Sequence, residues 1–193
     1  MNNLKLTIFV LPVIALILVG VLYILLSKRS SNKEAFRWFV LIISVLAFLF
    51  NIVWELAQAP LYKGYTGNLQ HTAFCILASV SDAVMVLLIY FGFALIYKNL
   101  FWADNLTWQR ISMIMIIGGI GAILIEVEHI SSGSWAYAKT MPIIPIVKVG
   151  LFPVLQFMVL PVIIYRLSFY RLKNLNTPKK KMKSSNESKG GYE

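Results

Sequence analysis

Five apolar stretches, separated by short polar segments, run along the 193-residue chain. They cover residues 6–26, 38–58, 71–97, 108–129 and 143–170. Each provides the roughly 20 mostly apolar residues that a helix needs to cross the hydrocarbon core of a membrane. No stretch has the alternating pattern of a barrel strand. The pattern therefore predicts an all-α membrane protein in which residues 1–173 form a single bundle of five transmembrane helices.

We expect the first stretch to remain in the mature chain. It is uncharged and longer than the apolar region of a signal peptide, and Ser27-Lys28-Arg29 follows it where a cleavage site would need small residues. At the other end, residues 174–193 are rich in lysine and poor in apolar side chains. Such a composition predicts a disordered tail.

Two details of the fourth and fifth stretches concern helix geometry. Gly118 and Ala122 form a small-xxx-small pair, which is typical of a close contact between helices. Pro145, Pro153 and Pro161 lie in the fifth stretch. We expect each to kink its helix, because proline removes a backbone hydrogen bond.

The composition agrees with a membrane protein and excludes a soluble domain of ordinary composition. Hydrophobic residues make up 59% of the chain and charged residues only 13%. The formal net charge of +10 would suit nucleic acid, but the basic residues gather in the tail and in one short loop between apolar stretches. Membrane topology explains that distribution, so we expect no nucleic-acid partner. The single cysteine, Cys75, excludes an internal disulfide.

The distribution of lysine and arginine predicts the orientation of the bundle. The segments after the first, third and fifth stretches carry Lys28, Arg29, Lys33, Arg37, Lys98, Arg110, Arg171, Lys173, Lys179, Lys180, Lys181, Lys183 and Lys189. The opposite side carries Lys5, Lys63 and Lys139. The positive-inside rule then places the amino terminus outside and the basic tail in the cytoplasm. Aromatic residues fit two membrane interfaces, with Trp38, Trp102 and Trp108 on the inner side and Tyr62, Tyr65, Trp135 and Tyr137 on the outer side.

Ionisable side chains lie within or at the ends of the second to fifth stretches, and such groups usually mark function in a membrane protein. They are Glu55, Asp82, Glu126, Glu128 and Lys148. A rise of about 1.5 Å per residue places them at similar depths in the outer half of the membrane. Helical spacing adds Asn51 and Gln58 beside Glu55, His71 beside Asp82, His129 beside Glu126, and Gln156 beside Lys148. We therefore predict one polar cavity in the outer half, lined by Glu55, Asp82, Glu126 and Lys148.

Several of these residues also have a structural interpretation. Glu128 and His129 suit a solvated helix end, and His71 suits a membrane interface. Asp82 and Lys148 suit a buried structural ion pair, because buried charges need partners.

Acid catalysis is the chemistry that these residue types favour. Burial disfavours the charged form of a carboxylic acid, so such a group keeps a proton that it can donate to an apolar substrate. Aromatic ring faces nearby stabilise a developing carbocation. The candidate catalytic residues are Glu55, Glu126 and Asp82, and the candidate pocket residues are Asn51, Trp54, Gln58, His71, Glu128, His129, Trp135, Tyr137, Lys148 and Gln156.

Two short segments resemble those of known membrane enzymes. The segment Asn51-x-x-Trp54-Glu55 is similar to the Asn-x-x-Trp-Glu segment of membrane-bound terpene cyclases that protonate meroterpenoid precursors. The segment from Glu126 to Pro142, with its Gly-x-Trp-x-Tyr pattern, resembles that of the small membrane lycopene cyclases and carotenoid hydratases. The resemblance implies that Glu55 and Glu126 are acid/base residues. The fungal cyclases have seven spans, and Ile143-Ile144 follows Pro142 where the lycopene cyclases carry Pro-Glu-Glu.

The whole chain is also similar to a group of small bacterial membrane proteins with a Trp-Glu-x-x-Gln-x-Pro-Leu-Tyr segment, here Trp54 to Tyr62. This resemblance implies a multi-pass protein of the bacterial inner membrane.

Three classes of function remain open at this point. The first is an acid-catalysing enzyme, similar to a cyclase or hydratase, that acts on an isoprenoid or another lipid. The second is a transporter or channel subunit, and the third is a non-catalytic component that binds a membrane-protein partner. We predict no cofactor and no metal. A haem or metal held by His71 and His129 stays open as an alternative.

Overall fold

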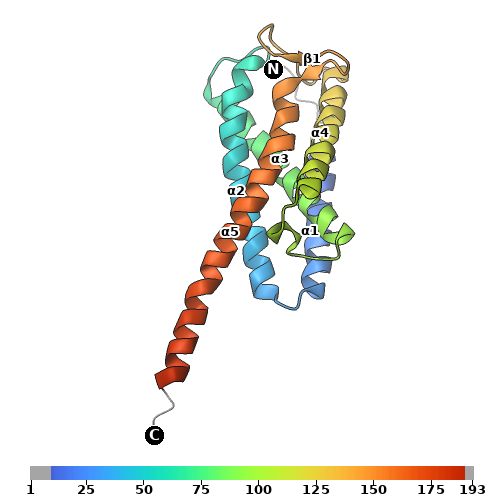
Figure 1. Cartoon of the computed structure of the whole chain (residues 1–193). Helices are drawn as coiled ribbons and strands as arrows, with labels where there is room; N and C mark the ends of the chain where they lie inside the picture. The colour runs from blue at the N-terminus through green and yellow to red at the C-terminus, as the bar shows by residue number, and fades with distance from the viewer. Residues whose placement is uncertain (1–9, 190–193) are drawn as a thin grey trace.

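The computed structural model describes residues 10–189, and side chains in residues 10–174. In this part of the chain, five long helices run alternately up and down in one bundle (Figure 1). They are α1 (Val10–Arg29), α2 (Lys33–Gln58), α3 (Leu69–Ile96), α4 (Trp108–Ser131) and α5 (Leu151–Lys189). Each is long and apolar enough to cross a membrane. The prediction of a multi-pass bundle of five helices is therefore confirmed.

Short elements mark the two ends of the bundle. The antiparallel strands β1 (Ile143–Ile144) and β2 (Val149–Gly150) form a hairpin at one end, which we call the hairpin end. The 3₁₀ helix η2 (Ala59–Leu61) directly follows α2. The opposite end, which we call the basic end, carries the loop between α1 and α2 and the exit of α5 (Figure 1). Which end faces the cytoplasm stays a prediction from the charge distribution.

Capping residues explain where three of the helices begin. The side chains of Asn32, Asn68 and Thr107 accept hydrogen bonds from backbone N–H groups in the first turns of α2, α3 and α4. Asparagine and threonine are favoured at this position because their oxygens satisfy N–H groups that have no partner inside the helix.

The fifth helix differs from its predicted range at both ends. It begins at Leu151, because residues 143–150 form the hairpin. Pro145 therefore lies in the hairpin turn and kinks no helix. Pro153 lies in the first turn of α5, where its missing N–H would have had no helical partner.

The predicted disorder of residues 174–193 also differs from the structure. α5 continues as a helix to Lys189, although side chains beyond residue 174 lie outside the described part. Lysine and methionine are good helix formers, so a helix that starts in the apolar segment extends into the lysine-rich one.

The order of packing leaves one seam of the bundle open. α2 packs against both α3 and α5, α4 packs against α5, and α1 packs against α3. α3 and α4 make few direct contacts, although they follow each other in the chain. The seam between α3 and α4 is therefore loosely packed.

Gly118 explains the tight packing of α4 on α5. A Cβ atom at this position would lie 2.0 Å from the backbone oxygen of Phe157. Ala122, one turn further along α4, is buried on the same helix. The prediction that these two small residues form a packing face is confirmed.

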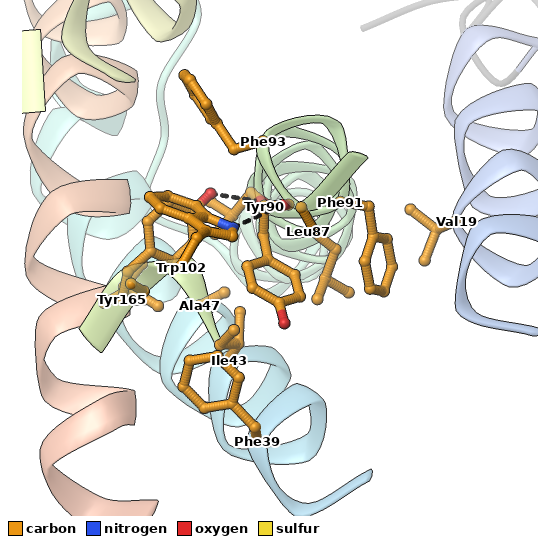
Figure 2. Packing of buried hydrophobic residues seen from close by; sticks show 14 of the residues in the cluster. Val19, Phe39, Ile43, Ala47, Leu87, Tyr90, Phe91, Phe93, Trp102 and Tyr165 are labelled. Atoms are coloured by element: carbon orange, nitrogen blue, oxygen red, sulfur yellow. Dashed lines mark hydrogen bonds between the residues drawn. The ribbon is translucent and has the colours of Figure 1, made fainter. Parts of the chain in front are cut away.

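An aromatic core fills the bundle towards the basic end (Figure 2). Its centre is Trp102, from the 3₁₀ helix η3 (Trp102–Asp104) in the loop between α3 and α4. The Trp102 indole is fully buried, donates a hydrogen bond of 3.2 Å to the carbonyl oxygen of Tyr90, and lies 5.4 Å from the Tyr165 ring, centroid to centroid. The Trp102 ring therefore faces the interior of the protein, because the loop folds back and inserts it between α3 and α5.

Candidate functional site

Polar side chains from three helices meet inside the bundle. Gln156 on α5 is central: its Nε2 donates to Asn51 Oδ1 at 2.8 Å and to Asp82 Oδ2 at 2.9 Å. Its Oε1 accepts a hydrogen bond from Gln58 Nε2 at 3.1 Å. The same Gln58 nitrogen lies 2.6 Å from Glu55 Oε1. We call Asn51, Glu55, Gln58, Asp82 and Gln156 the amide–acid network.

The amides of this network are almost completely shielded. Asn51, Gln58 and Gln156 are 1%, 4% and 2% exposed. Buried amides are costly without partners, and Asn51 additionally donates to the backbone oxygen of Ala47 at 2.8 Å. Within the described residues, Gln58 Oε1 has no hydrogen-bond partner. The network therefore ties α2, α3 and α5 together and leaves one acceptor free beside the acids.

The carboxyl groups of Glu55 and Asp82 lie within hydrogen-bonding reach of each other. They come from different helices, α2 and α3, and Gln156 contacts both. The structure thus brings two of the three candidate catalytic residues into one pair, which we call the acid pair.

The third acid, Glu126 on α4, is held by the loop that follows α4. The Tyr137 hydroxyl donates to Glu126 Oε2, and Trp135 Nε1 donates to the same oxygen at 3.4 Å. The loop turns back after α4 at Gly133, whose φ of 72° suits glycine. At Gly150 a Cβ atom would lie 3.1 Å from the Tyr137 ring, so the absence of a side chain makes room for that ring.

A third aromatic residue, Tyr62, joins the two halves of the site. Its ring lies 5.5 Å from the Tyr137 ring and 6.2 Å from the Trp135 ring, centroid to centroid. Two backbone hydrogen bonds of 2.8 Å flank it, from Lys63 N to Ala136 O and from Ala138 N to Leu61 O. We call Tyr62, Trp135 and Tyr137 the aromatic cap.

The electrostatics of the cap place it close to the acids. Burial, followed by the charges of Glu126 and Glu55, raises the pKa of Tyr62 above its usual range. Burial and the hydrogen bond to Glu126 raise the pKa of Tyr137 in the same way. Both phenols therefore stay neutral at ordinary pH, and the Tyr137 hydroxyl remains a hydrogen-bond donor to Glu126.

Two other predicted pocket residues lie behind the cap. The His129 ring stacks on the Trp135 ring with a centroid distance of 4.0 Å, and His129 Nδ1 lies 3.3 Å from the carboxylate of the exposed Glu128. His129 is itself buried. These contacts give His129 a supporting position behind Trp135.

His71 and Trp54 make their contacts elsewhere. His71 Nδ1 lies 2.9 Å from Thr66 Oγ1, in the loop before α3. Trp54 packs against the large hydrophobic core, and its Nε1 has no hydrogen-bond partner among the described residues. Neither side chain joins the amide–acid network.

Lys148 does not line the site, contrary to the prediction. It is exposed in the hairpin turn, where its φ is 56°. Among the described side chains it forms no ion pair with Asp82, whose carboxyl group accepts from Gln156 instead. The reason is that residues 143–150 form a hairpin, so Lys148 does not lie on a transmembrane helix.

Tyr62 is a site residue that charge and helical spacing do not reveal. Its position in the sequence predicts only a place at a membrane interface. Its place at the end of the Trp54-to-Tyr62 segment was the available signal, since that segment also contains Glu55 and Gln58.

An apolar groove lies in the seam between α3 and α4. Its cavity has a volume of about 120 Å³ and is lined by Met85, Ile89, Ile117, Gly118, Gly121, Ala122, Ile125 and Phe157. Met85 lies one turn along α3 from Asp82, and Ile125 directly precedes Glu126. The groove therefore runs along the bundle to the depth of the acids.

No group of three or more His, Cys, Asp and Glu side chains in the described part of the chain could hold a metal ion. Comparisons of the chain with protein-family models, curated proteins and solved structures give no match.

Proposed function

We propose that this protein is a membrane enzyme that uses buried carboxyl groups as acid and base towards an isoprenoid or another lipid. The observation that carries the proposal is the acid pair of Glu55 and Asp82, held by Gln58 and Gln156 between transmembrane helices. Carboxyl groups inside a membrane protein are costly and usually serve function.

The acid pair suits proton donation. Two carboxyl groups in contact repel each other when both are charged, and one proton shared between them removes that repulsion. Gln156 and Gln58 fix the orientation of the pair, because their amides donate to the carboxyl oxygens. A proton held at a fixed position in a water-poor site is available to a substrate and protected from exchange.

The aromatic cap and Glu126 suit the later part of such a reaction. A proton adds to one carbon of a substrate alkene, and the electron pair of the double bond forms the new C–H bond, leaving a carbocation on the neighbouring carbon. The ring faces of Tyr62 and Trp135 stabilise positive charge. Loss of a proton to Glu126 gives an isomerised or cyclised product, and capture by water gives a hydrated one. Neither outcome needs an oxidant or a reductant.

The groove between α3 and α4 offers a route for an apolar substrate. It is lined by aliphatic and aromatic side chains and reaches the depth of Asp82 and Glu126. A lipid can approach it sideways from the membrane, because α3 and α4 make few direct contacts.

The test is lipid analysis by mass spectrometry in cells that produce the wild-type protein, Glu55→Gln or Glu55→Ala. Glu55→Gln keeps the side-chain shape and cannot donate the proton, so we expect a folded protein without product. Glu34→Gln is the matched control, because Glu34 is an exposed glutamate on the same helix, α2, at its opposite end. Normal product from folded Glu55→Gln would contradict the proposal.

A second experiment tests the route of access. No atom lies within 4 Å of a Cβ placed on Gly121, which lines the groove. Gly121→Leu should therefore fill the groove, keep the fold and lower the amount of product. Gly92→Leu is the control, because Gly92 has equal space but does not line the groove.

A non-catalytic component of a membrane complex is the second candidate. The internal pairing of the network amides favours it, since such pairing also serves to fix three helices. Unchanged lipids in both Glu55→Gln and Glu55→Ala cells, together with a co-purifying membrane protein, would favour this function. A transporter is less compatible, because the aromatic core fills the path towards the basic end (Figure 2).

A further inference from the structure

A second and larger cavity lies at the basic end, and the proposed chemistry does not use it. Its volume is about 440 Å³, and it lies between η3 and the last turns of the membrane-spanning part of α5. Arg166, Tyr170 and Lys173 line it from α5, and Ala103 and Asp104 line it from η3. The spacing of the three α5 residues places them on one face of the helix.

The wall formed by η3 is held rigidly in place. Trp102 is anchored in the aromatic core, and Arg110 Nη1 donates to the carbonyl oxygens of Trp102 and Asn105 at 2.7 Å each. The Tyr90 hydroxyl also donates to Leu100 O at 2.5 Å. The η3 wall of the cavity is therefore in place before any ligand arrives, which lowers the cost of binding one.

The charge of the cavity favours an anion. Arg166 and Lys173 contribute two positive charges, and Asp104 contributes one negative charge. Within the described part of the chain, the Arg166 side chain has no hydrogen bond or ion pair and is exposed. A guanidinium group matches the geometry of phosphate oxygens, with which it forms charge-assisted hydrogen bonds.

The position of the cavity favours a lipid as the source of that anion. The membrane-spanning part of α5 ends at Asn174, and Arg166 lies about 12 Å before that end along the helix. This depth corresponds to the headgroup region and the adjoining acyl chains. Leu167 and Phe169 add apolar surface to the lining, beside the exposed ring of Tyr170.

We propose that this cavity binds the phosphate headgroup of an anionic membrane lipid. Arg166 and Lys173 contact the phosphate oxygens, and the lipid's acyl chains leave the cavity along Leu167 and Tyr170. The site is independent of the acids at the hairpin end and does not depend on the proposed reaction.

The experiment is native mass spectrometry of the full-length protein in detergent, titrated with phosphatidylglycerol, phosphatidylcholine or inorganic phosphate. We expect phosphatidylglycerol to bind in preference to phosphatidylcholine. The double variant Arg166→Gln/Lys173→Gln should bind it roughly 25-fold more weakly, from about fivefold for each basic residue. Lys28→Gln/Arg29→Gln is the matched control, because it removes the same charge at exposed positions of the same end.

Three results would overturn the proposal. Equal weakening in the cavity and control variants would mean that general surface charge attracts the lipid. Equal competition by inorganic phosphate would assign the cavity to a small anion. Equal binding of the two lipids would remove the role of charge. The variant Arg166→Lys serves as a second probe: it keeps the charge but loses the planar guanidinium, so it should bind up to about fivefold more weakly than the wild type and more tightly than Arg166→Gln.

Discussion

The side-chain amide of Gln156 on α5 donates a hydrogen bond of 2.9 Å to the carboxyl group of Asp82 on α3. The two residues are 74 positions apart in the chain, and the bond joins α3 to α5, two helices that are separated in the sequence by α4. The same amide nitrogen also donates a hydrogen bond to Asn51 on α2. Gln156 is therefore the one side chain among the described residues that hydrogen-bonds to both of these helices, and its replacement should affect all three elements at once.

Gln156→Leu should lower the free energy of unfolding by about 2 to 4 kcal/mol, because each buried polar group left without a partner costs about 1 to 3 kcal/mol. Thermal unfolding of the purified protein in detergent measures this effect. Gln109→Leu is the control, because Gln109 is exposed at the start of α4. An unfolding temperature for Gln156→Leu equal to that of the control would show that the network adds nothing to stability.

The tyrosines of the cap predict a loss of stability in alkaline solution. Burial raises the pKa of Tyr62 and of Tyr137 in the folded protein, whereas the unfolded chain has the ordinary value of about 10. The stabilising contribution is fully present below about pH 10 and is lost as the pH rises towards the folded values. Unfolding temperatures between pH 8 and 11 should therefore fall less steeply for Tyr62→Phe/Tyr137→Phe than for the wild type. An equal fall of the unfolding temperature in the variant and in the wild type over this pH range would contradict this explanation.

Gly118→Ala should weaken the packing of α4 on α5. The added Cβ atom would meet the Phe157 backbone oxygen at 2.0 Å, so the helices must move apart, at a cost of about 1 to 3 kcal/mol. The yield of folded protein after size-exclusion chromatography reports the effect. Gly92→Ala should behave like the wild type, because no atom lies within 4 Å of a Cβ placed there.

The orientation of the bundle is open to a direct test. Reporter fusions at Asn32 and at Ser185 should both report the cytoplasm, and a fusion at Gly67 should report the outside, because the basic residues gather on one side. An external signal from the fusion at Ser185 would reject this orientation.

The sequence was sufficient to predict the spanning helices and the polar face of α2. Long apolar stretches can only be spanning helices or buried ones, and the spacing of Asn51, Glu55 and Gln58 places them together on any helix. Their meeting with Asp82 and Gln156 follows from the matched depth of these residues, which a regular rise per residue makes calculable.

The start of the fifth helix was not predictable in the same way. Residues 143–150 are mainly apolar, and hydropathy does not distinguish an apolar hairpin from the first turns of a helix. The predicted position of Lys148, on the fifth transmembrane helix, was wrong for this reason alone. Trp102 and Tyr62 show a related limit, because a ring near a membrane interface can turn inwards when a loop folds back, and only tertiary packing decides its direction.

The pairing of residues 61–63 with residues 136–138 has a mechanical consequence for the bundle. It is a strap that connects the end of α2 to the chain just beyond α4, across the end of the bundle that carries the acids. With that end tied, α4 cannot separate from α2 as a rigid rod. The far end of α4 is tied as well, because Arg110 in its first turn donates to the carbonyl oxygens of Trp102 and Asn105. In the proposed reaction a lipid tail would therefore enter sideways through the seam between α3 and α4, while both ends of α4 and the rings of the cap stay in place.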